Sequence, residues 1–544
     1  MLSYRKLAMR VLGRPLHTGG IDSPRPASQR AAALVLTAAM LTTLTAPAFA
    51  KEWYIEEGDI TVRAGETEGT NKVSQGTNTD VEDTDTIITN SDKNTASSNT
   101  VTIEAKDKDD KVEVTLKDVN IDASSRSEAA VSVTGEGNTN IELDGDNALK
   151  SDIYSSGISS SGSLTISGGE NDSLTAQGGS GADGIYSSGS LTISGGTVTA
   201  NGGSSGGGDG GDGIWSSGGV TISGGSTVTA NGGDGKDDYG GDGIRSSDVT
   251  ISGGSTVTAN GGNGGNVSGD GIRSDGGVTI SGGTVKAAGG DSKDGYGGDG
   301  IRSGGGVTIF GNTVNAAGGN GGKVGGYGIC SFDRVAISGG TVEAAGGNGS
   351  TGGGSGIYSS VIDLSGSLEL TAKAGSPTGK ALLQNGRELD LDTIKDKLGP
   401  GAKVTTTDAN GKTKEVSSPL PVEPEGPVIP EESSSSSDDG SATPSAPASP
   451  LPGLTVTDKD GQRISYTSTQ SGNTLTVCVG RLTASFRISL AALRQLRAEG
   501  IATIAFQTGL CSTTLSVDEL LAMGGENAEA VLTHRFTDSS LTVG

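Results

Sequence analysis

The chain has 544 residues, including 95 glycines, and it carries a formal net charge of −25. Hydrophobic residues make up 32% of it and aromatic residues 3%, which is typical of a disordered chain unless the sequence is repetitive. The negative charge excludes electrostatic attraction to nucleic acid or to anionic lipid. It favours a soluble exported protein that attracts cations.

Residues 1–50 have the layout of a secretory signal. Basic residues precede the apolar run AAALVLTAAMLTTL, and small residues at Ala48 and Ala50 suit a cleavage site. An uncleaved anchor is the alternative, but the run is shorter than the roughly 20 residues that span a membrane. We predict a signal peptide over residues 1–50 and a secreted or cell-surface protein, with no transmembrane segment after cleavage.

Residues 51–150 precede the regular part of the chain. Within residues 101–150, the words VTIEA, VEVTLKDVNID and TNIELDGDN alternate apolar with polar residues, as a strand with one buried face does. We interpret them as early, irregular coils of a stacked fold. Residues 51–100 are then the first coil or the N-terminal cap, and a cap is expected because an open end would leave an unpaired strand edge.

A repeat of 27 to 30 residues follows, and it dominates the chain. Each copy holds three short strand-like words, such as GIWSS, GVTIS and STVTA, separated by glycine pairs. Strands this short become stable only when successive copies stack. We predict an all-β, right-handed parallel β-helix of about ten coils with three short strands per coil. The repeats align on Ile158, Ile185, Ile214, Ile244, Ile272, Ile301, Ile329 and Ile357.

The repeat fades after Lys380. We place the end of the β-helix domain, residues 51–415, just before the proline-rich segment that follows. Residues 416–453 are rich in proline, serine and acidic residues, which predicts an extended linker. Residues 454–544 predict a small α+β domain whose partner the sequence does not identify. Within it, Cys478 and Cys511 are candidates for a disulfide, and Cys330 would then remain single.

The residue after each repeat isoleucine changes from copy to copy and should face outward, because neighbouring strand residues point to opposite sides. Stacking would place these residues in one column. Flat aromatic faces suit sugar rings, and guanidinium groups pair with carboxylates, so the column predicts a site for an acidic polysaccharide. The alternative is that these side chains only shield an exposed strand. The candidate carbohydrate-binding residues are Tyr186, Trp215, Arg245, Arg273, Arg302 and Tyr358.

A second column precedes the first, three residues earlier in each copy. Stacked carboxylates repel one another, so a compensating partner is expected. Ca²⁺ is one candidate, since it takes carboxylate and carbonyl oxygens as ligands. The alternative is that each carboxylate accepts backbone N–H groups at the corner or pairs with the arginines. The candidate metal ligands are Asp183, Asp212, Asp242, Asp270 and Asp299; Tyr327 and Ser355 interrupt the pattern.

Only two histidines occur, His17 and His534, so a Ser-His-Asp or Cys-His arrangement cannot form in the repeats. A polysaccharide lyase or hydrolase that uses Asp and Arg is the main enzymatic alternative. Such an active site is one irregular cluster, whereas these residues occupy equivalent positions in many copies. We therefore predict no catalytic residues.

The words VTIEAKDKDDKVEVTLKDVNID, NIELDGDNALKSDIYSSGI and SLTISGGE, followed by repeated DGI and VTISGGTV, resemble secreted bacterial proteins with a carbohydrate-binding domain. The resemblance covers about residues 51–380 and is strongest at 101–200. It implies a pectate-lyase-like right-handed β-helix, polysaccharide binding, calcium and no lyase activity. The DGI residues carry over from Asp183-Gly184-Ile185 to Asp299-Gly300-Ile301, with departures at Tyr327 and Ser355.

Together these observations predict a non-catalytic polysaccharide-binding protein, with calcium as a candidate stabilising ion. Two other functions remain open: a structural or adhesin-like spacer that presents the C-terminal domain, and a polysaccharide lyase or hydrolase.

Overall fold

The computed structural model describes residues 51–418 and, in the C-terminal segment, residues 453–457, 462–464, 466–471, 474–479, 484–508, 512–523, 528–534 and 539–543. The predicted signal peptide, nearly all of the predicted linker and Cys511 lie outside these residues. Among the described residues, no helix is long and apolar enough to cross a membrane.

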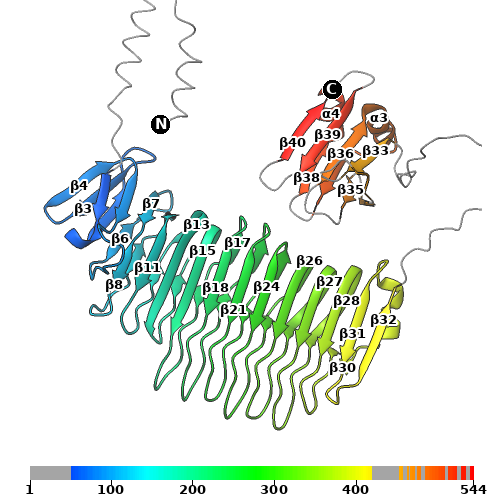
Figure 1. Cartoon of the computed structure of the whole chain (residues 1–544), viewed down its shortest axis with the longest axis horizontal. Helices are drawn as coiled ribbons and strands as arrows, with labels where there is room; N and C mark the ends of the chain where they lie inside the picture. The colour runs from blue at the N-terminus through cyan, green and yellow to red at the C-terminus, as the bar shows by residue number, and fades with distance from the viewer. Residues whose placement is uncertain are drawn as a thin grey trace, which may run out of the picture. The chain divides into compact units, whose positions relative to one another are not determined.

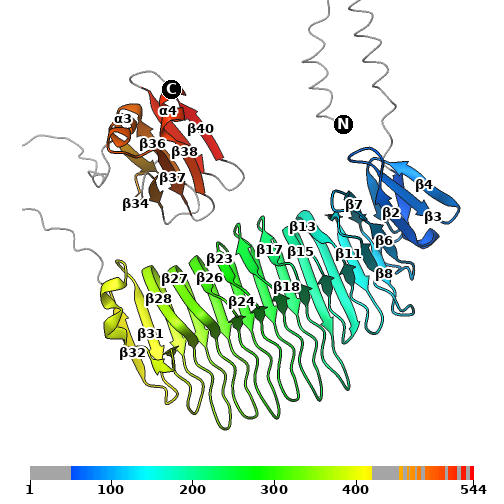
Figure 2. The same ribbon diagram turned by 180° about the vertical axis from the view of Figure 1, so that it is seen from behind.

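Residues 51–418 form a parallel β-helix, as the repeat predicts (Figures 1 and 2). Three parallel sheets run along its axis, and each coil contributes one short strand to each sheet. The structure has about 13 turns, more than the ten expected from the repeat. The additional turns come from residues 51–100 and from residues after Lys380, where the stacking continues although the repeat words are absent.

The first sheet holds the strands that begin at the repeat isoleucines. Its strands are β2 (Ile60–Ala64), β6 (Val101–Glu104), β9 (Val131–Thr134), β12 (Ile158–Ser160), β14 (Ile185–Ser187), β16 (Ile214–Ser216), β19 (Ile244–Ser246), β22 (Ile272–Ser274), β25 (Ile301–Ser303), the starts of β27 (Ile329–Ala345) and β28 (Ile357–Lys373), and β29 (Leu382–Gln384).

The second and third sheets hold the other two words of each copy. The second contains β1 (Lys51–Tyr54), β5 (Thr86–Thr89), β7 (Lys111–Lys117), β10 (Asn138–Asp144), β13 (Ser163–Ser180), β15 (Leu191–Gly203), β17 (Val220–Ser223), β20 (Val249–Ser252), β23 (Val278–Ser281) and β26 (Val307–Ala317). The third contains β8 (Asn120–Asp122), β11 (Asp146–Lys150), β18 (Thr227–Asn231), β21 (Thr256–Asn260), β24 (Thr284–Ala288) and β31 (Lys403–Thr407), with the later halves of the long strands.

Identical side chains stack along the interior. Ile185, Ile214 and Ile244 are paired in register and fully buried, and the valines and alanines of the other two sheets stack in the same way. Full burial of an isoleucine or valine is worth roughly 1.5–3 kcal/mol. The core of the β-helix is therefore built coil by coil from residues that are 27 to 30 positions apart in the sequence.

Hairpins close both ends of the β-helix. At the N-terminal end, β3 (Asn71–Gln75) pairs antiparallel with β2 and with β4 (Asn78–Asp83), after the short helix η1 (Ile55–Glu57). At the C-terminal end, β30 (Arg387–Glu388) pairs antiparallel with β29, and β32 (Thr413–Ser417) with β31; η2 (Leu391–Thr393) and η3 (Lys395–Lys397) lie between them. These antiparallel strands replace the open parallel edge that a bare end would expose.

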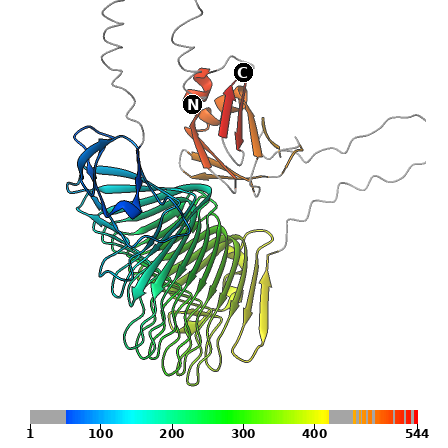
Figure 3. The same ribbon diagram turned by 60° about the vertical axis from the view of Figure 1, so that its left-hand side comes forward.

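Long glycine-rich loops connect the third sheet of one coil to the first sheet of the next; we call them the glycine loops. Figure 3 shows them stacked one behind another, and their backbones bond from coil to coil. Gly262 N–H donates to Gly241 O at 2.8 Å, and Gly269 N–H donates to Gly262 O at 2.9 Å. A Cβ atom at Gly262 would lie 2.0 Å from Gly233 O, so the close approach of backbones excludes any side chain there.

The C-terminal segment forms a separate small α+β unit. Its strands are β33 (Leu454–Thr457), β34 (Thr467–Ser471), β35 (Thr474–Cys478), β36 (Ala484–Ser489), β37 (Thr503–Gln507), β38 (Ser512–Ser516), β39 (Glu529–His534) and β40 (Ser539–Val543), in two four-stranded sheets. Helix α3 (Leu490–Ala498) begins after Ser489, whose hydroxyl accepts the N–H of Ala492. Helix α4 (Val517–Met523) follows Ser516.

The core of this unit is formed by both sheets. Phe486 packs against Phe506 with ring centroids 4.6 Å apart, and His534 is fully buried beside Phe486. The Cys478 thiol lies 3.3 Å from Gln507 Oε1. Because Cys511 lies outside the described residues, its pairing with Cys478 stays a prediction.

Candidate functional site

The predicted outward column exists on the first sheet. Tyr186 pairs in register with Trp215, Trp215 with Arg245, and the series continues through the next coils. In each of these strands the middle residue is half-buried while its two neighbours are buried, so its side chain faces outward. We call the outward residues the aromatic–arginine column: Tyr186, Trp215, Arg245, Arg273, Arg302 and Tyr358.

The first three members of this column touch one another. The rings of Tyr186 and Trp215 meet edge to face, with centroids 5.0 Å apart, and the Arg245 guanidinium lies 5.4 Å from the Trp215 ring centroid. The arginine side chains keep about two-fifths of their surface exposed: 41% for Arg245 and 37% for Arg273. Tyr186, Trp215 and Arg245 therefore form a half-exposed strip of flat groups in contact, and Arg273 and Arg302 follow them in register along the axis of the β-helix.

Two aromatic residues that the sequence reading left out extend this strip. Tyr327 occupies the position where the aspartate pattern breaks, and its ring stacks on Tyr358 with centroids 5.2 Å apart. Phe332 lies under the Arg302 guanidinium at 5.5 Å and is 53% exposed. The break at Tyr327 was visible in the sequence, but its ring could be placed beside Tyr358 only with the coils in register.

One position of the column is covered, although it lies in register with its outward neighbours. Cys330 occupies the place that follows Arg302, but it is buried, 2% exposed, and burial raises the pKa of its thiol. Its small side chain leaves the surface between Arg302 and Tyr358 without a protruding group. The strip consequently has two parts, a longer one from Tyr186 to Arg302 and a shorter aromatic one at Tyr358 and Tyr327.

The five aspartates form a second column beside the first. Asp212, Asp242, Asp270 and Asp299 are buried, and Asp183 is half-buried. The Oδ1 atom of each accepts the backbone N–H of the residue at the same position in the next coil, at 2.6–2.7 Å, ending with Tyr327 N–H on Asp299. These bonds fix the corner where each coil enters the first sheet.

The Oδ2 atoms of Asp212, Asp242 and Asp299 face arginines. Nη1 of Arg245 lies 4.0 Å from Asp212 Oδ2, and Nη1 of Arg302 lies 3.7 Å from Asp299 Oδ2. At these distances the ion pairs are weak, and they orient the guanidinium groups more than they stabilise the fold. The alternative reading of the aspartates, with corner N–H bonds and arginine partners, thus describes contacts that are present in the structure.

Burial raises the pKa of these carboxyl groups. It raises the pKa of Asp183 and Asp299 to about 6 and that of Asp242 and Asp270 to about 7; the pKa of Asp212 also rises. Repulsion between neighbouring carboxylates adds to the rise for Asp212, Asp242 and Asp270, while the accepted N–H groups oppose it. The carboxyl groups of the aspartate column are therefore partly protonated close to neutral pH.

A second ladder of hydrogen bonds, from backbone N–H groups to side-chain oxygens, lies in the glycine loops. It shows that asparagine can accept the same kind of bond as aspartate. There Asn263 N–H donates to Asp234 Oδ1 at 2.7 Å, and Asp291 N–H donates to Asn263 Oδ1 at 2.9 Å. Amide and carboxylate oxygens accept the same backbone bond in this exposed ladder. Asparagine would therefore suffice for the corners of the buried column, and the five aspartates contribute negative charge in addition to hydrogen bonding.

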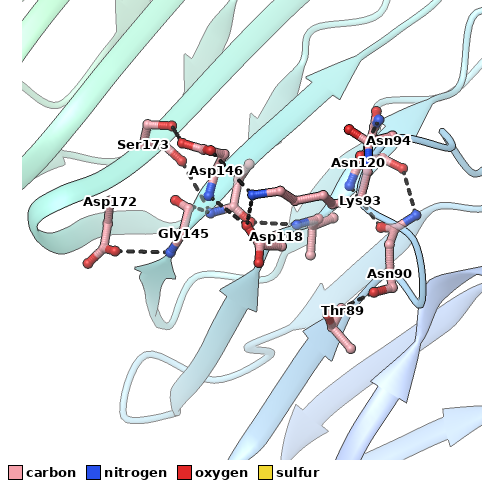
Figure 4. Close-up of polar contacts among 12 residues, drawn as sticks. Thr89, Asn90, Lys93, Asn94, Asp118, Asn120, Gly145, Asp146, Asp172 and Ser173 are labelled. Atoms are coloured by element: carbon pink, nitrogen blue, oxygen red, sulfur yellow. Dashed lines mark hydrogen bonds and ion pairs between the residues drawn. The ribbon is translucent and has the colours of Figure 1, made fainter.

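A third polar cluster lies on the turns of the first coils (Figure 4). Asp118 accepts the N–H of Asp146 at 3.1 Å and also pairs with Lys93, and Asp172 accepts the N–H of Gly145 at 2.9 Å. The backbone N–H of Asp146, followed by Lys93, lowers the pKa of Asp118. These aspartates already bond to turn N–H groups and to Lys93. We therefore interpret the cluster as one that stabilises the turns of the N-terminal coils.

The part of the chain that the structure describes contains no cluster of side chains suited to bind a metal ion. No three His, Cys, Asp or Glu side chains lie together there as candidate ligands. The five aspartates are spread along the axis, one per coil, and each uses one oxygen for a backbone bond.

The fold defines the chain as a capped parallel β-helix, a fold common among proteins that bind or process polysaccharides. No known family, no curated protein and no solved structure matches this chain.

Proposed function

We propose that the protein is an exported, non-catalytic polysaccharide-binding protein, and that the aromatic–arginine column is its binding surface. The observation that carries the proposal is the unbroken contact from Tyr186 through Trp215 to Arg245, continued by two further half-exposed arginines. An extended polymer that lies along the axis could stack sugar rings on the aromatic end. It would place its acidic groups on the guanidinium end.

The charges beside the column support an acidic ligand at its arginine end. The ion pairs of 3.7–4.0 Å hold the guanidinium groups in place, and the arginine side chains keep about two-fifths of their surface exposed. Arginine matches a carboxylate with two parallel N–H groups, and this geometry favours uronate groups over neutral sugars. In a chain with net charge −25, these arginines are a local exception.

Binding to immobilised polygalacturonate tests the proposal. We expect Trp215→Ala and Arg273→Ala to weaken retention by about tenfold each, since a well-packed aromatic or arginine anchor is typically worth more than 1 kcal/mol. Tyr239→Ala is the matched aromatic control, because Tyr239 is 51% exposed but lies on a glycine loop. Arg334→Ala is the arginine control, because Arg334 pairs with Asp363 outside the column.

Equal retention of the wild-type protein, Trp215→Ala and Arg273→Ala would remove the column from the proposal and favour a spacer that presents the C-terminal domain. Release of unsaturated or reducing sugar during the same incubation would favour a lyase or hydrolase. Both readouts come from one experiment.

Calcium binding on the aspartate column is tested separately from polysaccharide binding. An ion on the aspartate column would have to use the Oδ2 atoms, and those of Asp212, Asp242 and Asp299 already face arginines. We therefore expect a chelator to leave the unfolding temperature of the protein unchanged. A rise of several degrees with excess calcium, lost in Asp242→Asn, would assign the ion to this column.

A further inference from the structure

A groove of about 530 Å³ lies at the N-terminal end of the aromatic–arginine column. Its floor consists of column positions with small side chains, because Ser132 and Ser159 precede Tyr186 in the same register. Tyr186 and Tyr154 both line the groove. The groove is thus a hollow at the place where the column begins.

Tyr154 is held at this groove in an unfavourable backbone conformation. Its φ angle is +63°, in the left-handed region that bulky side chains rarely adopt, and the residue is 84% exposed. A Cβ atom at Gly181 would lie 3.9 Å from Tyr154 Cε1, which places the ring next to Gly181 of the following coil. A strained, exposed aromatic residue gains nothing from core packing, and such strain is concentrated at ligand sites.

The aspartate column also begins in this groove. Asp183 is its first member, and it is the one aspartate of the five that is not fully buried. Its Oδ1 atom accepts the N–H of Asp212, and within the described residues no basic side chain lies within 4.0 Å of its carboxylate. Serine occupies the equivalent position in the preceding coil, at Ser156, so nothing there continues the charge.

The lining of the groove is acidic and aromatic. Glu128 supplies the second carboxylate, and no lysine or arginine lines the groove. Arg126 pairs with Glu128 at 3.3 Å and with Asp59 at 2.7 Å, and the charge of Arg245 reaches Asp183 only from beyond 4.0 Å. Aromatic faces and the Asp183 carboxylate, which has no ion-pair partner among the described residues, together attract an organic cation, through the ring quadrupole and through charge.

We propose that this groove is a subsite for a protonated amino sugar, in which Asp183 pairs with the ammonium group and Tyr154 and Tyr186 hold the sugar ring. This inference rests on the proposed function. It specifies the ligand as a polysaccharide that carries both amino sugars and acidic sugars, with the amino sugar toward the N-terminal coils and the acidic groups toward Arg302. A bound ammonium group would also lower the pKa of Asp183, which burial holds at about 6.

The test compares two probes on the full exported chain by calorimetry at pH 7: the β-1,4-linked tetramer of glucosamine and its fully N-acetylated counterpart. N-acetylation removes the charge and keeps the ring. We expect the glucosamine tetramer to bind at least tenfold more tightly. Asp183→Asn should reduce this preference to less than threefold, because asparagine still accepts the N–H of Asp212, as Asn263 does for Asp291.

Asp242→Asn is the matched control, since Asp242 lies in the middle of the same column and does not line the groove. It should leave the preference for the glucosamine tetramer intact, while Tyr154→Ala weakens both probes. Equal affinity for the two tetramers, or an unchanged preference in Asp183→Asn, would overturn the subsite. Displacement of the glucosamine tetramer by calcium at low concentration would overturn it too, by assigning the groove to a metal ion.

Failure of the subsite and failure of the proposed function give different results. If the column binds acidic polysaccharide and the groove binds no amine, Arg273→Ala weakens polygalacturonate retention and both tetramers bind alike. If the groove binds the amine and the column binds nothing, Arg273→Ala leaves polygalacturonate retention unchanged and Asp183→Asn still removes the preference between tetramers.

Discussion

Replacing Gly262 by alanine is expected to destabilise the β-helix by about 3 kcal/mol, the upper part of the range for overpacked positions. A Cβ atom there would lie 2.0 Å from Gly233 O and 2.5 Å from Gly233 C. Both are backbone atoms of the stacked glycine loops. The clash with the new Cβ atom therefore cannot be relieved by the movement of a side chain. The expected result is an unfolding midpoint in urea that falls well below that of the wild-type protein, measured by circular dichroism.

Gly207→Ala is the control for this prediction. Gly207 also lies in a glycine loop, but a Cβ atom there would have no neighbour within 4 Å, and its φ angle lies outside the left-handed region. Its substitution should change stability by less than about 0.5 kcal/mol, as for other surface positions. If both variants unfolded at the wild-type midpoint, the close approach of the glycine loops would not exist in solution.

Stability of the β-helix is expected to rise as the pH falls from 8 to 5. Burial raises the pKa of Asp242 and Asp270 to about 7 and that of Asp183 and Asp299 to about 6, whereas an unfolded aspartate titrates near 3.9. Between these values the folded state binds more protons than the unfolded state. The stability that they contribute is therefore fully present below about pH 4 and is lost as the pH rises through 6 and 7.

The expected size of this pH effect is on the order of 5 kcal/mol, because each pKa unit is worth about 1.4 kcal/mol and the neighbouring groups titrate together. Carboxylates with lowered pKa, such as Asp59 and Asp118, act in the opposite sense. Their contribution is lost only as the pH falls below about 4, which places the stability maximum near pH 4–5.

Urea midpoints at pH 5 and pH 8, at constant ionic strength, measure this effect. The double variant Asp242→Asn and Asp270→Asn keeps the two backbone acceptors and removes two of the titrating groups with the highest pKa. Its midpoint should change much less between the two pH values. A wild-type midpoint that is higher at pH 8 than at pH 5 would contradict the burial of this column.

The repeat made the fold predictable, because a period of 27 to 30 residues with three alternating words leaves few ways to bury the apolar positions. The register of Trp215 beside Arg245 followed directly and is confirmed. The coil count was too low because β1, β5 and β31 keep the alternation but have lost the repeat words. Stacking depends on the pattern of burial and survives the loss of the words themselves.

The candidate site was predictable only where it repeats. The aspartate column could be read from spacing, but its burial and its bonds to the next coil depend on how tightly the corners stack. The groove beside Tyr154 was missed because it arises from small side chains at Ser132 and Ser159, next to a large one at Tyr186. A hollow formed by a change in side-chain size along a column has no motif in the sequence.

The terminal hairpins have an evolutionary consequence. Because β3 and β4 close one end and β32 closes the other, an interior unit can be duplicated or deleted without exposing a new edge. Unequal recombination between near-identical DNA segments would then lengthen or shorten the aromatic–arginine column by whole units. Related genes in different strains should accordingly differ in the number of DGI words while both closing segments persist.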